Sequence, residues 1–388
     1  MKPPTLVAAP GGHAPGEASW RRSHPALLCI VVGLLCLLGL MMVLSASSVE
    51  ALHDYGGAWL FFQRQLLWLV LGVGALAATI RLDYHRWRRP SGPFVVVCLV
   101  LLVLVLIPAL GLEVSGSRRW LGWGPLRIQP SELAKLALLI FAADLLARRA
   151  DRVREPGAIV KPLFVVLGAF GGLVMLQPDM GTTIVLCLIV LTVLFVGGLP
   201  VLRMAGVLVA SAGAGLVVGL VEGYRRARLF SFLDPWKDAG NTGYQVAQSL
   251  VALGSGNYTG VGLGASRAKW GFLPNAHTDF IFAIIGEELG LIGTSLVVAL
   301  FMAFTYLGVK TALRAPDRFG SLLAAGVTGW IAGQAVVNMG AVTGRLPVTG
   351  VPLPFVSFGG SALVVSLAAV GILVNVARQS TDGDRRHG

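Results

Sequence analysis

The sequence predicts an all-α polytopic integral membrane protein with about ten transmembrane helices. Of the 388 residues, 55% are hydrophobic and 13% are charged, about half the charged fraction of a soluble domain. Apolar runs of roughly 20 residues, the length that crosses a bilayer core, recur along the chain. Lys and Arg gather in alternate connections between these runs, as they do in multi-span membrane proteins.

Ten apolar segments qualify as spans. In chain order they are residues 26–48, 60–80, 93–112, 131–147, 162–176, 180–198, 204–221, 280–309, 320–342 and 361–377. With both termini in the cytoplasm, 19 of the 31 Lys and Arg residues fall in cytoplasmic segments and ten in outer segments. The positive-inside rule therefore predicts cytoplasmic termini. The Lys and Arg residues in the segments between the spans account for the net charge of +12, so no nucleic-acid partner is expected.

The two ends of the chain differ in composition from the spans. Residues 1–24 are rich in Pro, Gly and Ala, which predicts a disordered cytoplasmic tail. Arg21, Arg22 and the apolar run after them also resemble a signal peptide, but the run is longer than the usual ~7–15 residues. We therefore predict a membrane domain over residues 25–378 and a second cytoplasmic tail over 379–388.

Three outer segments are long and rich in Gly, Pro and Trp: 113–130, 222–278 and 343–360. Segment 222–278 is the large outer loop between the seventh and eighth predicted helices, and it carries six Lys or Arg residues. One interpretation is an interfacial amphipathic segment that touches anionic lipid. The other is a cationic surface that faces a negatively charged substrate. The two interpretations are compatible.

Asp279 stands at the start of the apolar run that follows the large outer loop. Glu287 and Glu288 are the next carboxylates along this run. On one helix a separation of eight residues is about 12 Å of rise, and nine residues reach the opposite face. Paired glycosidase carboxylates face each other at most ~9.5 Å apart. Asp279 is therefore expected to act alone or with groups from other outer loops. The nearby His277 is either a solvent-exposed loop histidine or a metal ligand.

Other polar residues of the predicted spans have structural interpretations. Glu132 and Lys135 are three residues apart, so they can neutralise each other on one helix face, and a role in the site is the alternative. Asp179 is predicted to cap the helix that follows Pro178. The four cysteines lie in apolar runs without the spacing of metal ligands.

Five stretches of the chain resemble, in order and with compatible spacing, the SEDS family of bacterial cell-wall proteins (FtsW/RodA/SpoVE). They read "GSRRWLGWGPLRIQPSELAK", "GYQVAQSLVALGSG", "GVGLG", "FLPNAHTDFIFAIIGEELGLIG" and "PVTGVPLPFVSFGGSA". The resemblance extends from about residue 30 to 378. On "VLSASSV" and "AKWGFLPNAH" the chain is most similar to the division branch of the family, FtsW. An elongation-type, RodA-like member is the alternative.

The resemblance implies a peptidoglycan glycosyltransferase that polymerises lipid II at the outer face of the cytoplasmic membrane during septal cell-wall synthesis. It also implies that Asp279 is essential for activity, that Trp120 lines an outer cavity, and that Glu132 interacts with Lys135. The chemistry agrees, because joining a sugar hydroxyl to a sugar diphosphate needs a base for the proton and cations for the leaving diphosphate.

Asp279 is accordingly the expected general base. The expected substrate-binding residues are Trp120, Arg118, Arg119, His277 and Lys269. Whether a divalent cation such as Mg²⁺ or Mn²⁺ takes part is left open, and no other cofactor is expected.

The resemblance further implies partners and a location. The partners are lipid II, the nascent glycan strand, a class B penicillin-binding protein (an FtsI-like transpeptidase) and other divisome membrane proteins, and the location is the cytoplasmic membrane at the septum. Two other functions stay open: a lipid II flippase or other transporter, and a scaffold for the transpeptidase. Small-residue runs at 168–172 and 210–215 allow close helix approach. The glycine-rich loop 222–278 is expected to be too flexible to hold Asp279 without a partner.

Overall fold

The computed structural model describes residues 15–382 except 115, 124–125, 153–155, 201–205, 207–231, 233 and 242. Nine of the ten predicted spans correspond to helices within these residues, and the seventh, 204–221, lies outside them apart from Gly206. The helices are α1 (Pro15–Tyr55), α2 (Leu60–Arg81), α3 (Ser91–Leu106), α4 (Pro130–Arg148), α5 (Pro156–Leu176), α6 (Met180–Val196), α9 (Tyr244–Ser255), α10 (Ile281–Leu313), α11 (Arg318–Val342) and α12 (Gly360–Asp382), with short 3-10 helices η1 (Tyr84–Arg88) and η2 (Ala150–Arg152).

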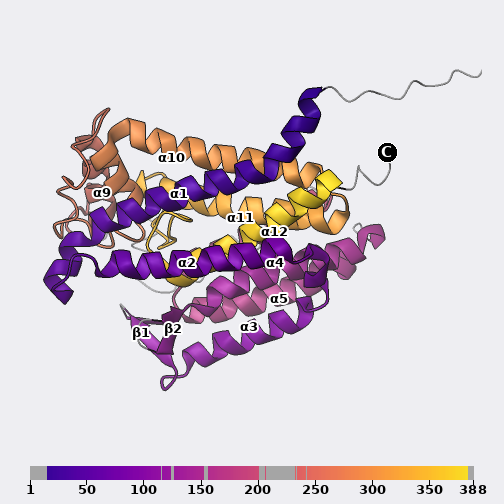
Figure 1. The fold of residues 1–388 in the computed structure, drawn as a ribbon. Helices are drawn as coiled ribbons and strands as arrows, with labels where there is room; N and C mark the ends of the chain where they lie inside the picture. The colour runs from indigo at the N-terminus through magenta and orange to yellow at the C-terminus, as the bar shows by residue number, and fades with distance from the viewer. Residues whose placement is uncertain are drawn as a thin grey trace, which may run out of the picture.

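The long helices run side by side as a bundle with two distinct ends (Figure 1). The start of α1 and the end of α12 lie at one end, which we call the termini end. The opposite end, which we call the loop end, carries α9 and strands β1 and β2. Both described chain ends therefore lie at the same end of the bundle, as the predicted topology requires.

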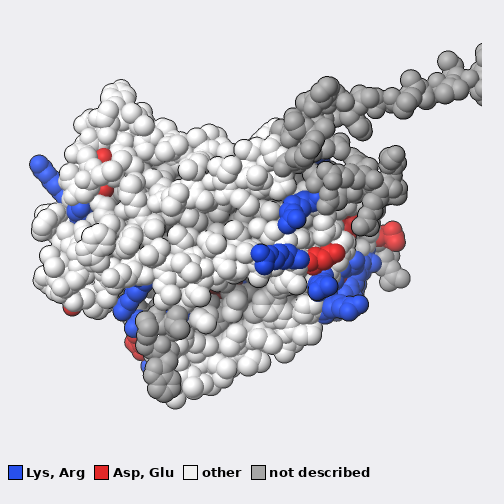
Figure 2. All heavy atoms as spheres, viewed as in Figure 1, with Lys and Arg blue, Asp and Glu red and all other residues white. Residues whose placement is uncertain are grey.

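Among the described residues, six helices are long and apolar enough to cross a membrane. They are α1 from Ser23, α2, α5 from Ile159, α10, α11 and α12 to Ser380, and α3 and α6 are shorter apolar helices. α4 is more charged, but its charges pair: Lys135 Nζ lies 2.7 Å from Glu132 Oε2, and Arg148 Nε lies 2.8 Å from Asp144 Oδ1. In the view of Figure 2, a broad band without charged side chains crosses the molecule, and most of the visible Lys and Arg lie at the termini end.

A small antiparallel sheet at the loop end was not expected from the sequence. Its order is β1 (Gly111–Val114), β2 (Ser117–Trp123) and β3 (Leu126–Ile128). Leu112 pairs with Trp120, and Leu121 pairs with Ile128. The predicted span 93–112 is therefore too long, because α3 ends at Leu106 and β1 begins at Gly111. Apart from this sheet, the described chain is all-α.

The first and last helices extend past the predicted bounds of the membrane domain. α1 begins at Pro15, inside the stretch predicted to be a tail, and α12 continues to Asp382, beyond the predicted boundary at 378. Pro is tolerated at the first helical position because the N–H that it lacks has no partner there. Residues 1–14 and 383–388 lie outside the described residues.

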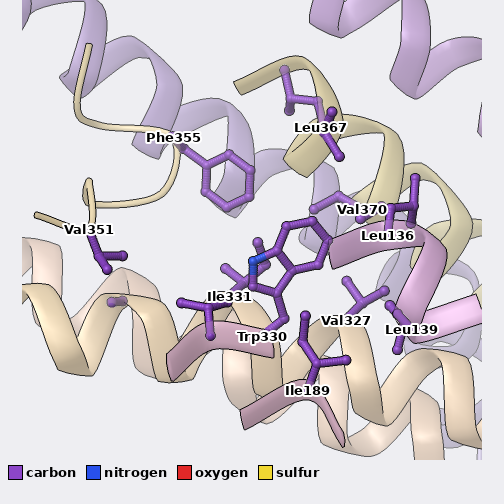
Figure 3. Close-up of a cluster of buried hydrophobic side chains, with 14 of the residues drawn as sticks. Leu136, Leu139, Ile189, Val327, Trp330, Ile331, Val351, Phe355, Leu367 and Val370 are labelled. Carbon is purple, nitrogen blue, oxygen red and sulfur yellow. The ribbon is translucent and has the colours of Figure 1, made fainter. Parts of the chain in front are cut away.

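Helix α11 contacts α4, α6, α10 and α12 and forms the middle of the core. Trp330 of α11 is fully buried, and Figure 3 shows it among Leu136, Leu139, Ile189 and Val370. α11 approaches α6 closely because it presents glycines to it: a Cβ at Gly329 would lie 2.5 Å from Thr192 Cγ2. This is the packing of small residues that holds membrane helices together.

Candidate active site

Asp279 lies at the loop end, two residues before α10 begins at Ile281, and it is partly exposed. Its backbone carbonyl accepts a hydrogen bond of 2.8 Å from Asn338 Nδ2 on α11. Its carboxylate Oδ2 lies 3.6 Å from the position that a Cβ would take on Gly350. Asp279 is therefore held between the end of α11 and the segment 347–359, which connects α11 to α12.

Segment 347–359 folds back onto the residues around Asp279. Ser357 Oγ donates to the Thr278 carbonyl at 2.6 Å and accepts from the Leu353 amide at 2.8 Å. The Phe358 amide donates to the His277 carbonyl at 3.0 Å. Two segments that are distant in the sequence thus form one structural unit.

His277 is buried, with 7% of its surface exposed. Its Nδ1 lies 3.2 Å from Glu50 Oε2, and its ring packs against Phe61 and Phe358, at 4.8 and 5.7 Å between centroids. The interpretation as a solvent-exposed loop histidine is therefore wrong, because the fold of 347–359 and the end of α1 cover this side chain. His277 contributes to packing beside Asp279.

Arg119 links the sheet to the start of α6. Its Nε donates to the Gln177 carbonyl at 2.9 Å, and its Nη1 lies 3.9 Å from Asp179 Oδ2. Asp179 caps α6, as the sequence predicted, by accepting from the Thr182 amide at 3.0 Å. A Cβ at Gly181 would lie 2.5 Å from the Thr349 carbonyl oxygen. The turn that Arg119 contacts therefore abuts the segment that faces Asp279.

Arg118 and Trp120 are fixed by the sheet itself. Arg118 Nη2 lies 3.1 Å from Glu113 Oε2 on the neighbouring strand, and Trp120 is partly exposed opposite Leu112. Arg119 joins this sheet to the turn near Asp279, and Gln129, directly after β3, donates to Asp179 Oδ2 at 3.3 Å.

Glu132 and Lys135 form a buried ion pair near the start of α4, with 3% and 2% of their side chains exposed. Lys135 Nζ also donates to Gln334 Oε1 at 3.3 Å and lies 5.1 Å from the ring centroid of Trp330. A buried cation is tolerated when a carboxylate and further acceptors surround it in this way. The pair is connected to the site because Gln334 Nε2 donates to the Pro352 carbonyl at 2.9 Å.

Two site residues were missed by sequence reasoning: Gln334 and Asn338. They are one turn apart on α11, and both donate their side-chain amides to carbonyls of 351–352, where Asn338 reaches Val351 at 2.8 Å. The pattern that indicates them is a pair of amide side chains, four residues apart, inside an otherwise apolar helix.

Glu287 and Glu288 hold the end of the large loop against α10. Glu288 is fully buried, accepts from Ser45 Oγ at 2.6 and 2.8 Å, and lies 3.6 Å from Lys269 Nζ. Glu287 accepts from the amide of Arg267 at 2.9 Å. Lys269 also donates to the Gly264 carbonyl at 2.6 Å. The structure therefore gives Lys269, expected to bind substrate, a set of partners inside the protein.

Glycines let the part of this loop after α9 pack closely against α10. Gly290 interrupts α10 with a φ of 65°, and the loop packs into this kink. The amides of Val261 and Gly262 donate to the carbonyls of Glu287 and Glu288 at 2.9 and 3.1 Å. Gly260 has a φ of 82°, and a Cβ there would lie 2.1 Å from the Glu288 carbonyl oxygen. Glycine is therefore needed at Gly260 for the close approach of the loop to α10.

The arrangement combines a partly exposed carboxylate with cations at the same end of the bundle. Asp279 is placed where it can accept a proton, and Arg119 lies beside the turn that abuts segment 347–359. Among the described residues, no three His, Cys, Asp or Glu side chains converge as metal ligands do. Chemically, the site can act as a base beside positive charge.

The fold and the site define a multi-pass membrane protein with a carboxylate site at one end of its helix bundle. The model of the FtsW/RodA/SpoVE family, described as cell cycle protein, matches residues 25–382. The chain belongs to this family.

Similar proteins include curated relatives and solved structures. Stage V sporulation protein E of Bacillus subtilis is 43% identical over 364 residues, which is 93% of this chain and 99% of that protein. A probable peptidoglycan glycosyltransferase FtsW of Geobacter metallireducens is 40% identical over 351 residues, 90% of this chain and 93% of that protein.

Among solved structures, a chain of a peptidoglycan synthase complex that coordinates polymerization and crosslinking is 30% identical, with a TM-score of 0.74 over 91% of this chain and 97% of that one. The rod shape determining protein RodA of Thermus thermophilus is 29% identical, with a TM-score of 0.68 over 91% and 96% of the two chains.

Proposed function

We propose that this protein polymerises lipid II into glycan strands at the outer face of the cytoplasmic membrane, with Asp279 as the general base. The chain is a peptidoglycan glycosyltransferase of the FtsW/RodA/SpoVE family. The observation that carries the mechanism is the position of Asp279: its carboxylate is partly exposed at the loop end and lies 3.6 Å from the Cβ position of Gly350.

Asp279 takes the proton of the acceptor hydroxyl in this mechanism. The hydroxyl oxygen forms a bond to the anomeric carbon of the donor sugar, and the bond from that carbon to the lipid diphosphate breaks. The diphosphate leaves with the electron pair, so its charge must be met by cations. A strong acid is not needed, because the diphosphate is already a good leaving group once it is neutralised.

Arg119 is the best-placed of the expected substrate-binding cations. Its guanidinium is partly exposed and contacts the Gln177–Asp179 turn, which abuts segment 347–359 at Gly181. Arg118 and Trp120 extend this surface on the sheet, where an aromatic ring can stack on a sugar and a guanidinium can bind a phosphate. We assign His277 and Lys269 positioning roles, since both are enclosed by protein.

The mechanism is tested with purified protein and labelled lipid II. Asp279→Asn keeps the shape of the side chain but removes the base, so we expect polymerisation to fall by at least ~10²-fold, the contribution of general base catalysis. Glu113→Gln is the matched control, because Glu113 is a carboxylate at the same end that pairs with Arg118, and it should retain full activity. Full activity of the Asn variant would reject Asp279 as the base.

The same assay separates the alternative functions. Glycan chains as products identify a polymerase. Translocation of lipid II in liposomes without chain products would identify a flippase. If the protein shows neither activity, alone or with a transpeptidase, the scaffold function is the one that remains. The liposomes should hold protein of one orientation, because we propose that the loop end faces outside and that the termini are cytoplasmic.

We further propose a septal role, on the similarity to FtsW proteins at 40% identity and more. A division polymerase is needed to complete the septum, so its depletion should give filaments that keep their diameter. An elongation polymerase is needed for the side wall, so its depletion should give round cells. Rounding in place of filamentation would assign this chain to elongation.

A further inference from the structure

Asn338 joins the two segments that form the candidate site. The residue is 2% exposed, and its Nδ2 donates to the Asp279 carbonyl at 2.8 Å and to the Val351 carbonyl at 2.8 Å. Carbonyl oxygens only accept hydrogen bonds, so the amide nitrogen must face both of them. Both N–H groups of this nitrogen are therefore used, one for each segment.

The other half of the same side chain supports a role based on donation. Asn338 Oδ1 is buried and finds no hydrogen-bond partner among the residues that the structure describes. A buried unsatisfied acceptor costs free energy. The two hydrogen bonds that the amide nitrogen donates are therefore what favours Asn at this position.

The bridge joins Asp279 to the segment that lies next to its carboxylate. Val351 follows Gly350, whose Cβ position lies 3.6 Å from Asp279 Oδ2. One turn earlier on α11, Gln334 holds the Pro352 carbonyl at 2.9 Å. Both segments are therefore held by the same helix, α11. Asn338 contacts both of them.

We propose that Asn338 is a positioning residue, which places the Asp279 carboxylate against segment 349–351 at the distance that the reaction needs. The proposal rests on the proposed role of Asp279 as base. Without the bridge, the two carbonyls lose their common donor, and the segments stay joined further along, where Ser357 and Phe358 contact the carbonyls of Thr278 and His277. A displacement of about 1 Å can lower a rate by ~10²-fold when reacting groups must be aligned.

The test compares Asn338 with a matched asparagine at the other end of the bundle. Asn375 is also buried, at 6% exposure; its Nδ2 donates to the Ile80 carbonyl at 2.7 Å, and its Oδ1 accepts from the Tyr84 amide at 3.0 Å. Asn338→Ala and Asn375→Ala both remove a buried bridge, so both should lower thermal stability. Only Asn338→Ala should lower kcat for lipid II polymerisation, by roughly 10- to 100-fold with KM unchanged.

A second variant separates donation from packing. Asn338→Asp keeps the volume of the side chain but replaces the donor nitrogen with an oxygen that faces two carbonyls, and we expect its kcat to be as low as that of Asn338→Ala. Asn338→Ser keeps one donor and should lie between Asn338→Ala and the wild type. Rates are normalised to monodisperse, folded protein measured by size-exclusion chromatography.

The outcomes distinguish this proposal from the proposed function. If Asp279→Asn is inactive while Asn338→Ala and Asn338→Asp have the wild-type kcat, the positioning role is rejected and the base remains. An equal loss of kcat in Asn375→Ala would also reject it, because the effect would then follow stability alone. If Asp279→Asn is fully active, the proposed mechanism itself fails.

Discussion

Gly350 lies next to the Asp279 carboxylate, and its backbone conformation favours glycine. Its φ is 74°, in the left-handed region that costs a residue with a Cβ about 1–2 kcal/mol. A Cβ would also occupy the space 3.6 Å from Asp279 Oδ2. A methyl group there would narrow the approach to the base as well as strain the turn.

We expect Gly350→Ala to lower lipid II polymerisation more than it lowers stability. Gly344→Ala is the control, because Gly344 lies in the same connection with a φ of 68° and its Cβ would lie 3.2 Å from Val246 Cγ1 rather than beside Asp279. Both variants should lose a similar 1–2 kcal/mol of unfolding free energy, measured by thermal unfolding in detergent. Equal specific activities would show that Gly350 has a conformational role only.

At the scale of elements, the kink in α10 is the feature that anchors the large outer loop. Gly290 breaks the helix, which exposes the carbonyls of Glu287 and Glu288 to the loop amides of Val261 and Gly262. The side chains of Glu287 and Glu288 also contact the loop, at the Arg267 amide and at Lys269 respectively. Ser45 of α1 takes part, so three elements meet at one buried carboxylate: α1, α10 and the loop.

Ser45→Ala should loosen this loop. It removes the hydroxyl that donates to both oxygens of Glu288 at 2.6 and 2.8 Å, and a buried acceptor left short of donors costs about 1–3 kcal/mol. We expect faster hydrogen–deuterium exchange in peptides covering residues 256–269. Ser47→Ala is the control, because the Ser47 hydroxyl donates within its own helix, to the Val43 carbonyl at 2.6 Å. Unchanged exchange in Ser45→Ala would remove α1 from the anchor.

At the scale of the whole molecule, the large loop divides at α9. The part after α9 is anchored to α10, as described above. In the described residues 234–241 and 243, hydrogen bonds join near neighbours: the Lys237 amide to the Asp234 carbonyl at 3.3 Å, and the Gly243 amide to the Asp238 carbonyl at 3.1 Å. Local turns of this kind leave room for a second protein to add contacts.

We therefore expect the lone protein to be weakly active and a cognate class B penicillin-binding protein to raise its rate. The solved synthase complex that this chain resembles concerns the coordination of polymerization and crosslinking, and a transpeptidase beside the loop end fits that pairing. Initial rates of lipid II polymerisation are measured for the lone protein and for the co-purified complex at equal concentration. Equal rates would reject activation by the partner and leave the glycosyltransferase assignment intact.

Much of the helix arrangement could be predicted from the sequence, because a membrane helix satisfies its own backbone and needs about 20 apolar residues. This rule located nine described helices but not all of their ends, since α1 covers Pro15–Tyr55 where 26–48 was predicted. It did not find the sheet 111–128, since its short strands depend on pairing with each other. It also did not find α9, a helix of 12 residues inside the large loop, which is too short for the rule.

The sequence by itself determined the class of protein, the acidic residue at the start of α10 and the neutralisation of Glu132 by Lys135, because these depend on composition and on spacing along one helix. Only the tertiary structure decided which polar groups meet. Asn338 reaches Asp279 across 59 residues, Lys269 turns inward to Glu288, and His277 is enclosed by Phe61 and Phe358. These contacts depend on how helices and loops pack in three dimensions, and a one-dimensional period of 3.6 residues carries no information about that packing.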